Sequence, residues 1–219
     1  MYDSVHEENP FLLGVQLMTK RIAYIIGPSK SGKTTAANNI CQLQKDCYHL
    51  EGDKFFEHVH EGAFNTTLDE FSGNGEYGEW WDVDTWRRLE SLNSVKLACE
   101  FRHGLESFDK STNFVSYDKL VIECCMLAVK EVRELFEKEF LKYVRSKGGE
   151  DICVESRVFY LRVPDVVLGY QLNKPEINVG RHQEYIERYV RGYPVYLVHY
   201  DTIGVDARSY LREGERDGV

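Results

Sequence analysis

The chain has 219 residues, a length that suits one α/β domain with a sizeable core. Its net charge of −9 disfavours broad nucleic-acid binding, because such binding depends on Lys and Arg neutralising phosphates, although a local basic groove stays compatible with it. No apolar run approaches the length of about 18 residues that a membrane-spanning helix needs, so we expect no membrane partner.

The cysteine pattern points to a reducing compartment. The six cysteines show no CxxC spacing, and several lie in apolar runs, which is typical of reduced thiols in a cytosolic protein. The acidic N-terminus lacks the basic stretch of a signal peptide. We therefore expect a cytoplasmic location.

A phosphate-binding motif lies between the first predicted strand and the first predicted helix. Residues 1–19 read as an N-terminal extension, residues 22–26 are apolar and β-branched, and a helix is expected from about Thr35. Between strand and helix, the sequence GPSKSGKT of residues 27–34 fits the pattern GxxxxGK(S/T) at every fixed position. A strand, a Gly-rich turn and a helix N-terminus are the context that this motif requires.

The chemistry of this motif is the binding of a nucleoside triphosphate. Backbone N–H groups of the turn and the dipole of the following helix converge on the phosphates. Lys33 would reach the β- and γ-phosphates, and the Thr34 hydroxyl would ligate Mg²⁺. The predicted nucleotide-binding residues are Gly27, Pro28, Ser29, Lys30, Ser31, Gly32, Lys33, Thr34 and Thr35.

The next part of the chain alternates between strand and helix patterns. Residues 47–50 predict a second strand that ends at Gly52-Asp53, and residues 57–79 read as a long surface loop. Asp84 is expected to cap a helix that ends near residue 100, before a polar stretch over 102–118.

The pattern continues to the C-terminus. Residues 120–123 predict a buried strand, and an amphipathic helix over about 127–146 is expected to stop at Gly148-Gly149. Further strands are expected over 158–163 and 195–200, with a helix over 181–191 between them. Residues 165–192 form a candidate lid. Residues 204–219 are expected to form a charged, peripheral tail.

This alternation predicts the fold class. Strands that alternate with helices behind a phosphate loop indicate an α/β protein with a parallel sheet of about five strands. We expect one P-loop NTPase-type domain over residues 1–219, with helices on both faces of the sheet and three layers in all.

Two carboxylates fall at predicted strand ends, where ligands gather in such a sheet. Asp53 follows Lys33 by one helix and one strand, and it could accept the proton of an attacking hydroxyl. Glu123 is better placed to hold Mg²⁺, directly or through water. Asp53 could alternatively be a turn residue after Gly52. Glu123 could alternatively be a helix-capping or surface carboxylate.

At these positions the chain resembles the nicotinamide riboside kinases and, more loosely, the uridine kinases. Those enzymes have a GxxxxGKTT loop and then a DDFF segment, which is similar to residues 27–35 and 53–56 except that Lys54 replaces the second Asp. The resemblance implies that Asp53 is the base and Glu123 the metal-site carboxylate. It also implies that Phe56 and Trp81 contact the acceptor, Trp81 by stacking on its base, and that Asp82 binds ribose hydroxyls.

Two departures from that family concern the lid and the spacing. The family's lid is rich in Arg, whereas residues 165–174 contain none, and the segment between Glu123 and Val158 is longer than expected. Arg181, with two later arginines near one helical face, could replace the family's lid arginines and stabilise charge on the transferred phosphoryl group. That helix could equally be a solvated surface helix, and Trp80-Trp81 a pair of core aromatics.

The sequence therefore predicts a kinase that uses ATP and Mg²⁺. Lys33 and Asp53 would be catalytic, Thr34 and Glu123 would hold the metal, and the γ-phosphate would pass to a hydroxyl of a nucleoside-like small molecule. Two alternatives stay open: a kinase acting on a modified base in nucleic acid or on a nucleotide, and a nucleotide-binding switch without catalysis. The acceptor and the oligomeric state do not follow from the sequence.

Overall fold

The architecture is a parallel β-sheet between two layers of helices. The structure is a computed structural model, and it describes residues 18–28, 31–52, 94–164, 187, 195–198 and 200–213. Its five-stranded sheet has the order β2-β3-β1-β4-β5, and every pairing is parallel. The strands are β1 (Met18–Ile26), β2 (Cys47–Glu51), β3 (Lys119–Glu123), β4 (Ile152–Leu161) and β5 (Val195–Val198). The predicted fold class is confirmed.

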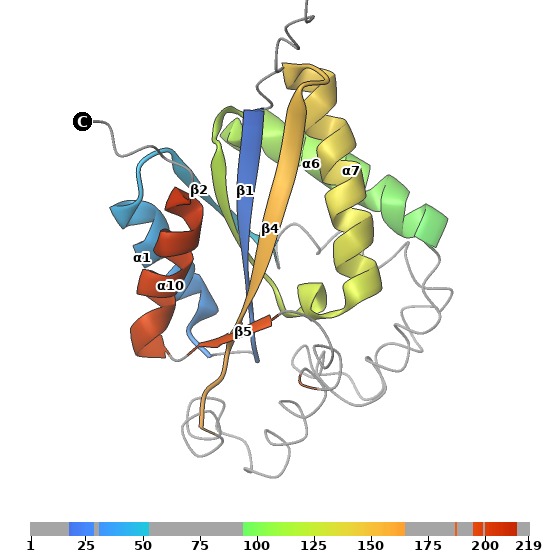
Figure 1. Cartoon of the computed structure of the whole chain (residues 1–219). Coiled ribbons are helices and arrows are strands. Elements are labelled where there is room, and N and C mark those ends of the chain that lie inside the picture. The colour runs from blue at the N-terminus through green and yellow to red at the C-terminus, as the bar shows by residue number, and fades with distance from the viewer. Residues whose placement is uncertain are drawn as a thin grey trace, which may run out of the picture.

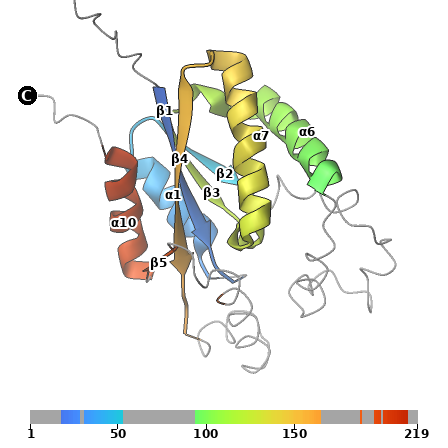
Figure 2. The ribbon, with the colours of Figure 1, turned by 45° about the vertical axis from the view of Figure 1, so that its right-hand side comes forward.

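The helices lie on both faces of this sheet. Figure 1 shows α1 (Lys33–Leu43) and α10 (Tyr200–Arg212) on one face, and α6 (Ser94–Thr112) and α7 (Lys130–Gly148) on the other. Figure 2 shows the same division after rotation. The strand order explains this division. α1 lies in the connection from β1 to β2 and α7 in the connection from β3 to β4, and these two connections run in opposite directions along the sheet. Because connections between parallel strands are right-handed, the two helices must cover opposite faces.

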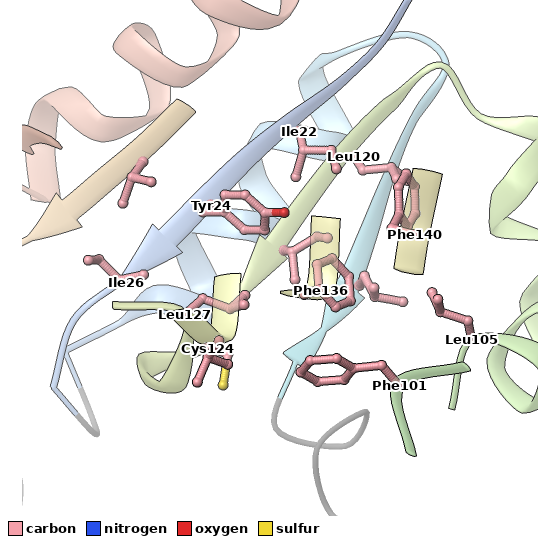
Figure 3. Close-up of a cluster of buried hydrophobic side chains, with 14 of the residues drawn as sticks. Ile22, Tyr24, Ile26, Phe101, Leu105, Leu120, Cys124, Leu127, Phe136 and Phe140 are labelled. Carbon is pink, nitrogen blue, oxygen red and sulfur yellow. The ribbon is translucent and has the colours of Figure 1, made fainter. Parts of the chain in front are cut away.

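β1 is the centre of the core. Each residue from Ile22 to Ile26 is fully buried, because helices cover both faces of a central parallel strand. Ile22, Tyr24 and Ile26 belong to the cluster under α6 and α7, which Figure 3 shows. Ala23 and Ile25 belong to the cluster under α1 and α10. The strand is an uninterrupted run of apolar residues because both of its faces are buried.

α6 extends well beyond its predicted end. The expected stop near residue 100 and the polar stretch over 102–118 are wrong, because α6 runs to Thr112 and a 3-10 turn follows at Phe114–Ser116. Phe101 and Leu105 are fully buried, and Phe108 packs against the same cluster. An apolar residue every three or four positions continues the buried face, although polar residues surround it.

The C-terminal segment is not a peripheral tail. The prediction for residues 204–219 is wrong as far as residue 213, because α10 buries Ile203, Ala207, Tyr210 and Leu211 on one face. Four of the other positions of α10 are charged, namely Asp201, Asp206, Arg208 and Arg212, which is why the segment looks solvated in the sequence.

A side chain of β4 holds the end of α10 in place. The Arg157 guanidinium lies 4.3 Å from the centre of the Tyr210 ring and donates two hydrogen bonds to the Glu213 carboxylate, 2.8 and 3.1 Å long. The helix is therefore attached both through its apolar face and through a charged pair.

Other element boundaries shift by a few residues. β1 begins at Met18, inside the expected N-terminal extension, and β4 begins at Ile152, six residues before its predicted start at Val158. α7 ends at the predicted glycine pair, where Gly149 has a φ of 101°. In the described part of the chain, no helix is both long and apolar enough to cross a membrane.

Some predicted segments lie outside the described residues. They are the extension up to residue 17, the surface loop over 57–79, the start of the helix that Asp84 was expected to cap, and residues 214–219. Within the candidate lid beyond residue 164, the structure describes Glu187, whose carboxylate lies 3.4 Å from Nε of Arg162.

α10 offers a matched pair of substitutions, since Leu211 is fully buried and Val205 is 60% exposed. Leu211→Ala should lower the free energy of unfolding by about 2–5 kcal/mol, because it leaves a cavity. Val205→Ala should change that free energy by less than about 0.5 kcal/mol. Urea unfolding followed by circular dichroism measures both. Equally small losses would mean that this helix contributes little to the core.

Candidate functional site

The phosphate loop leaves the carboxyl end of β1 and leads directly into α1. The backbone N–H of Ser31 donates to the carbonyl of Pro28 at 3.3 Å, which closes the loop on itself. Gly32 adopts a left-handed φ of 88°, a conformation that glycine accepts readily, and α1 begins at the next residue. The helix therefore starts at Lys33, inside the motif, rather than at Thr35.

The early helix start directs backbone donors at the loop. The first helical hydrogen bond runs from the N–H of Ala36 to the carbonyl of Gly32, 2.9 Å long. The N–H groups of residues 33–35 consequently have no acceptor within the helix, and they face the loop together with the positive end of the helix dipole. This arrangement favours an anion such as a phosphate.

Two buried polar side chains of the loop also fit a phosphate group. Lys33 is 6% exposed, and its ammonium donates to the Pro28 carbonyl at 2.9 Å, so its charge is held over the loop. The Ser31 hydroxyl is buried and finds no hydrogen-bond partner in the described part of the chain. Since an unsatisfied buried hydroxyl is unfavourable, a phosphate oxygen would supply the acceptor that it lacks.

The predicted metal ligands lie together at the mouth of the loop. The Thr34 hydroxyl donates to Oε1 of Glu123 at 3.0 Å, although the two residues are 89 positions apart. Glu123 ends β3, its side chain is 3% exposed, and it pairs with Ile25 of β1 and Glu51 of β2. A hydroxyl and a carboxylate beside a phosphate site form a donor set that suits Mg²⁺.

His49 is a neighbour of this pair that the sequence analysis missed. Its Nε2 lies 4.0 Å from Oε1 of Glu123, and its Nδ1 lies 2.9 Å from the side-chain oxygen of Asn38 on α1. The imidazole thus connects α1 with the end of β3. One signal was available in the sequence: His49 is a polar residue inside a predicted strand, on the face opposite the buried Leu50.

Gly52 packs directly against the backbone of the metal-site strand. A Cβ atom at this position would lie 2.4 Å from the Glu123 carbonyl oxygen and 2.5 Å from Cβ of Cys124. Only glycine permits so close an approach between the ends of β2 and β3. Gly52 is also the residue that precedes Asp53.

The remaining predicted site residues fall outside the described residues. They are Ser29 and Lys30 of the loop, Asp53, and the predicted acceptor contacts Phe56, Trp81, Asp82 and Arg181. The structure therefore brings together the phosphate-binding and metal-binding half of the predicted site.

No protein-family model matches the chain, and no curated protein matches it. Solved structures that resemble it include a gluconokinase from Sinorhizobium meliloti 1021, with 14% identity over 90% of this chain and 93% of the other and a TM-score of 0.44. A tunicamycin resistance protein from Deinococcus radiodurans has 14% identity over 87% and 93%, with a TM-score of 0.46. Shikimate kinase from Acinetobacter baumannii has 15% identity over 89% and 93%, with a TM-score of 0.45.

These scores describe a loose resemblance of overall shape. The assignment of a P-loop NTPase-type fold rests on features of this chain itself: a phosphate loop after the central strand, a helix that starts inside the motif, and an acidic residue at the end of the neighbouring parallel strand.

The close contact at Gly52 predicts an effect on both stability and metal-dependent binding. Gly52→Ala should lower the free energy of unfolding by about 1–3 kcal/mol, because the new methyl group collides with backbone atoms that cannot easily move. If the loop binds ATP with Mg²⁺ as the sequence predicts, this variant should also weaken ATP binding more in Mg²⁺ than in EDTA, because the nearest colliding atom is the carbonyl oxygen of Glu123. Urea unfolding and isothermal titration calorimetry measure the two effects.

Gly204→Ala is the matched control for this substitution. Among the described residues, a Cβ at Gly204 would meet only Nη1 of Arg208, at an ordinary contact distance of 3.6 Å. This variant should bind ATP as the unmodified protein does. Unchanged stability and binding in Gly52→Ala would contradict the tight packing between the ends of β2 and β3.

Proposed function

We propose that this protein is a P-loop kinase that uses ATP and Mg²⁺ to phosphorylate a hydroxyl group of a small molecule. The observation that carries the proposal is the 3.0 Å hydrogen bond between Thr34, at the start of α1, and Glu123, at the end of β3. A phosphate loop alone would indicate phosphate binding. A buried carboxylate on the hydroxyl of that loop adds the metal-binding chemistry that phosphoryl transfer requires.

The described residues divide the work of binding ATP. The loop amides, the first N–H groups of α1 and the Ser31 hydroxyl bind phosphate oxygens. Lys33 exchanges its hydrogen bond to Pro28 for the β- and γ-phosphates. Thr34 and Glu123 would hold Mg²⁺, directly or through water, and the metal would supply positive charge against those phosphates.

We propose Asp53 as the general base. It accepts the proton of the acceptor hydroxyl as the hydroxyl oxygen attacks the γ-phosphorus, while the bond from that phosphorus to the bridging oxygen of ADP breaks. Support comes from the sequence resemblance and from Gly52, which packs on the Glu123 backbone and is bonded to Asp53.

The proposed acceptor is nucleoside-like, and this part rests on the sequence resemblance. Trp81 would stack on a planar base, Asp82 would bind ribose hydroxyls, and Phe56 would line the same pocket. Arg181 would stabilise charge on the transferred phosphoryl group. A nucleotide, or a modified base within nucleic acid, would suit the same chemistry, and the long segment over 57–79 would accommodate a bulkier acceptor.

The test is release of ADP that depends on an acceptor. Nucleosides, nucleotides, sugars and DNA containing hydroxymethylated bases are each added to the protein with ATP and Mg²⁺. A kinase should release ADP many times faster with its acceptor than with water alone, and a nucleoside should be the best acceptor. A salt-dependent gel shift with the modified DNA would favour the polymer substrate.

Lys33→Ala is the control for this assay. It removes the charge on the β- and γ-phosphates, so the acceptor-dependent rate should fall almost to background while the melting temperature stays within a few degrees. Tight ATP binding by the unmodified protein, with no acceptor that stimulates ADP release, would instead identify a nucleotide-dependent switch.

Substitutions of the two carboxylates should affect different kinetic quantities. Asp53→Asn should lower kcat by at least roughly 10²-fold with little change in ATP affinity, as expected for the loss of a general base. Glu123→Gln should raise the Mg²⁺ concentration needed for half-maximal activity, so added metal should partly restore the rate. A Mg²⁺ titration of both variants compares them. Identical titration curves would show that the division of roles is wrong.

A further inference from the structure

The thiols of Cys41 and Cys47 are in direct contact. Cys41 lies in the last turn of α1, Cys47 is the first residue of β2, and their Sγ atoms are 2.8 Å apart. Both cysteines are free and only partly buried, at the edge of the cluster under α1 and α10. The two side chains therefore combine close contact with partial exposure of the residues.

The backbone fixes this contact. The turn between the two cysteines is closed by a hydrogen bond from the N–H of Gln44 to the Cys41 carbonyl, 3.4 Å long, and by the left-handed φ of 55° at Asp46. The N–H of Lys119 on β3 donates to the Asp46 carbonyl at 3.3 Å and ties the turn to the sheet. The backbone that carries the two cysteines is thus held in a fixed turn.

A second contact joins the same two elements. Asn38 of α1 and His49 of β2 lie 2.9 Å apart, one helical turn before Cys41 and two residues after Cys47. α1 and β2 are therefore fixed to each other at two levels. An S–S bond is about 2.05 Å long, so closing it requires a sulfur displacement of less than about 1 Å.

We propose that Cys41 and Cys47 form a redox-reactive dithiol, which a peroxide oxidises to an intramolecular disulfide. This reaction is independent of the kinase chemistry proposed above. The pair lies about two turns of α1 beyond Lys33, or about 12 Å along the helix axis, at the opposite end from the phosphate loop.

Either thiol can start the reaction, because either sulfur can be the donor in the contact between them. The thiolate of one cysteine attacks one peroxide oxygen, the O–O bond breaks, hydroxide leaves and takes up a proton, and that cysteine becomes a sulfenic acid. The thiolate of the other cysteine then attacks the sulfenic sulfur, the S–O bond breaks, and the leaving oxygen takes up a proton and departs as water. Two thiols and one hydrogen peroxide give one disulfide and two waters.

The other cysteines supply the contrast. Cys124 and Cys125 are buried in the core, whereas Cys99 on α6 is exposed. If exposure alone decided reactivity, Cys99 would react first. If the paired geometry decides it, Cys41 and Cys47 react first.

The test is peptide mapping of the native, full-length protein after treatment with hydrogen peroxide. Remaining thiols are alkylated, and trypsin is expected to cut after Lys33, Lys45 and Lys54, which separates the two cysteines. A disulfide then appears as residues 34–45 linked to residues 46–54, and dithiothreitol removes the link. We expect the paired thiols to be lost at least roughly tenfold faster than the Cys99 thiol.

Variants test the pairing. Cys41→Ser and Cys47→Ser should each abolish the link and leave a sulfenic acid on the remaining cysteine of the pair, which dimedone traps. Cys99→Ser is the matched control and should form the link at the unmodified rate. Absence of the linked peptide in the unmodified protein under conditions that oxidise Cys99 would overturn the proposal.

Discussion

The complete burial of Ile22–Ile26 in β1 is the constraint on which the rest of the structure depends. Five successive residues of this strand are inaccessible to water, because one hydrophobic cluster lies on each of its faces. The start of the strand is fixed as well: the buried ammonium of Lys20 donates to the carbonyls of Val115 and Tyr117, at 2.7 and 2.8 Å. With its central strand immobilised, the sheet presents the phosphate loop at a defined point on its carboxyl edge.

The position of the metal-binding pair follows from this arrangement. β3 lies beside β1, and the register pairs Glu123 with Ile25, two residues before Gly27. The loop turns back into α1, so Thr34 arrives above the end of β3 and contacts the Glu123 carboxylate. Two residues that are distant in the sequence meet because the sheet places the ends of β1 and β3 side by side.

Charged clusters elsewhere serve the packing of the helices. Glu139 of α7 is nearly buried and accepts hydrogen bonds from Arg102 of α6 and from Lys142. Burial by itself would raise the pKa of Glu139, but the hydrogen bonds from Lys142 and Arg102 outweigh it and lower that pKa. Tyr143 donates to Asp109 across the same pair of helices, at 3.0 Å. This cluster joins α6 to α7, the two helices that cover one face of the sheet. Charge alone therefore does not mark a functional site.

The sequence by itself determined the fold class, the phosphate loop and the carboxylate at the end of β3. These features are local: the loop motif is contiguous, and a strand buried on both faces is an apolar run in the sequence.

The sequence did not determine the burial of α10, the first half of β4 or the place of His49. Charged residues hide the buried face of α10, and the register with β1 extends β4 through polar residues around Glu155. His49 reaches Glu123, and Cys41 reaches Cys47, only when α1 and β2 lie against each other. Those contacts join separate elements, so only the tertiary structure could decide them.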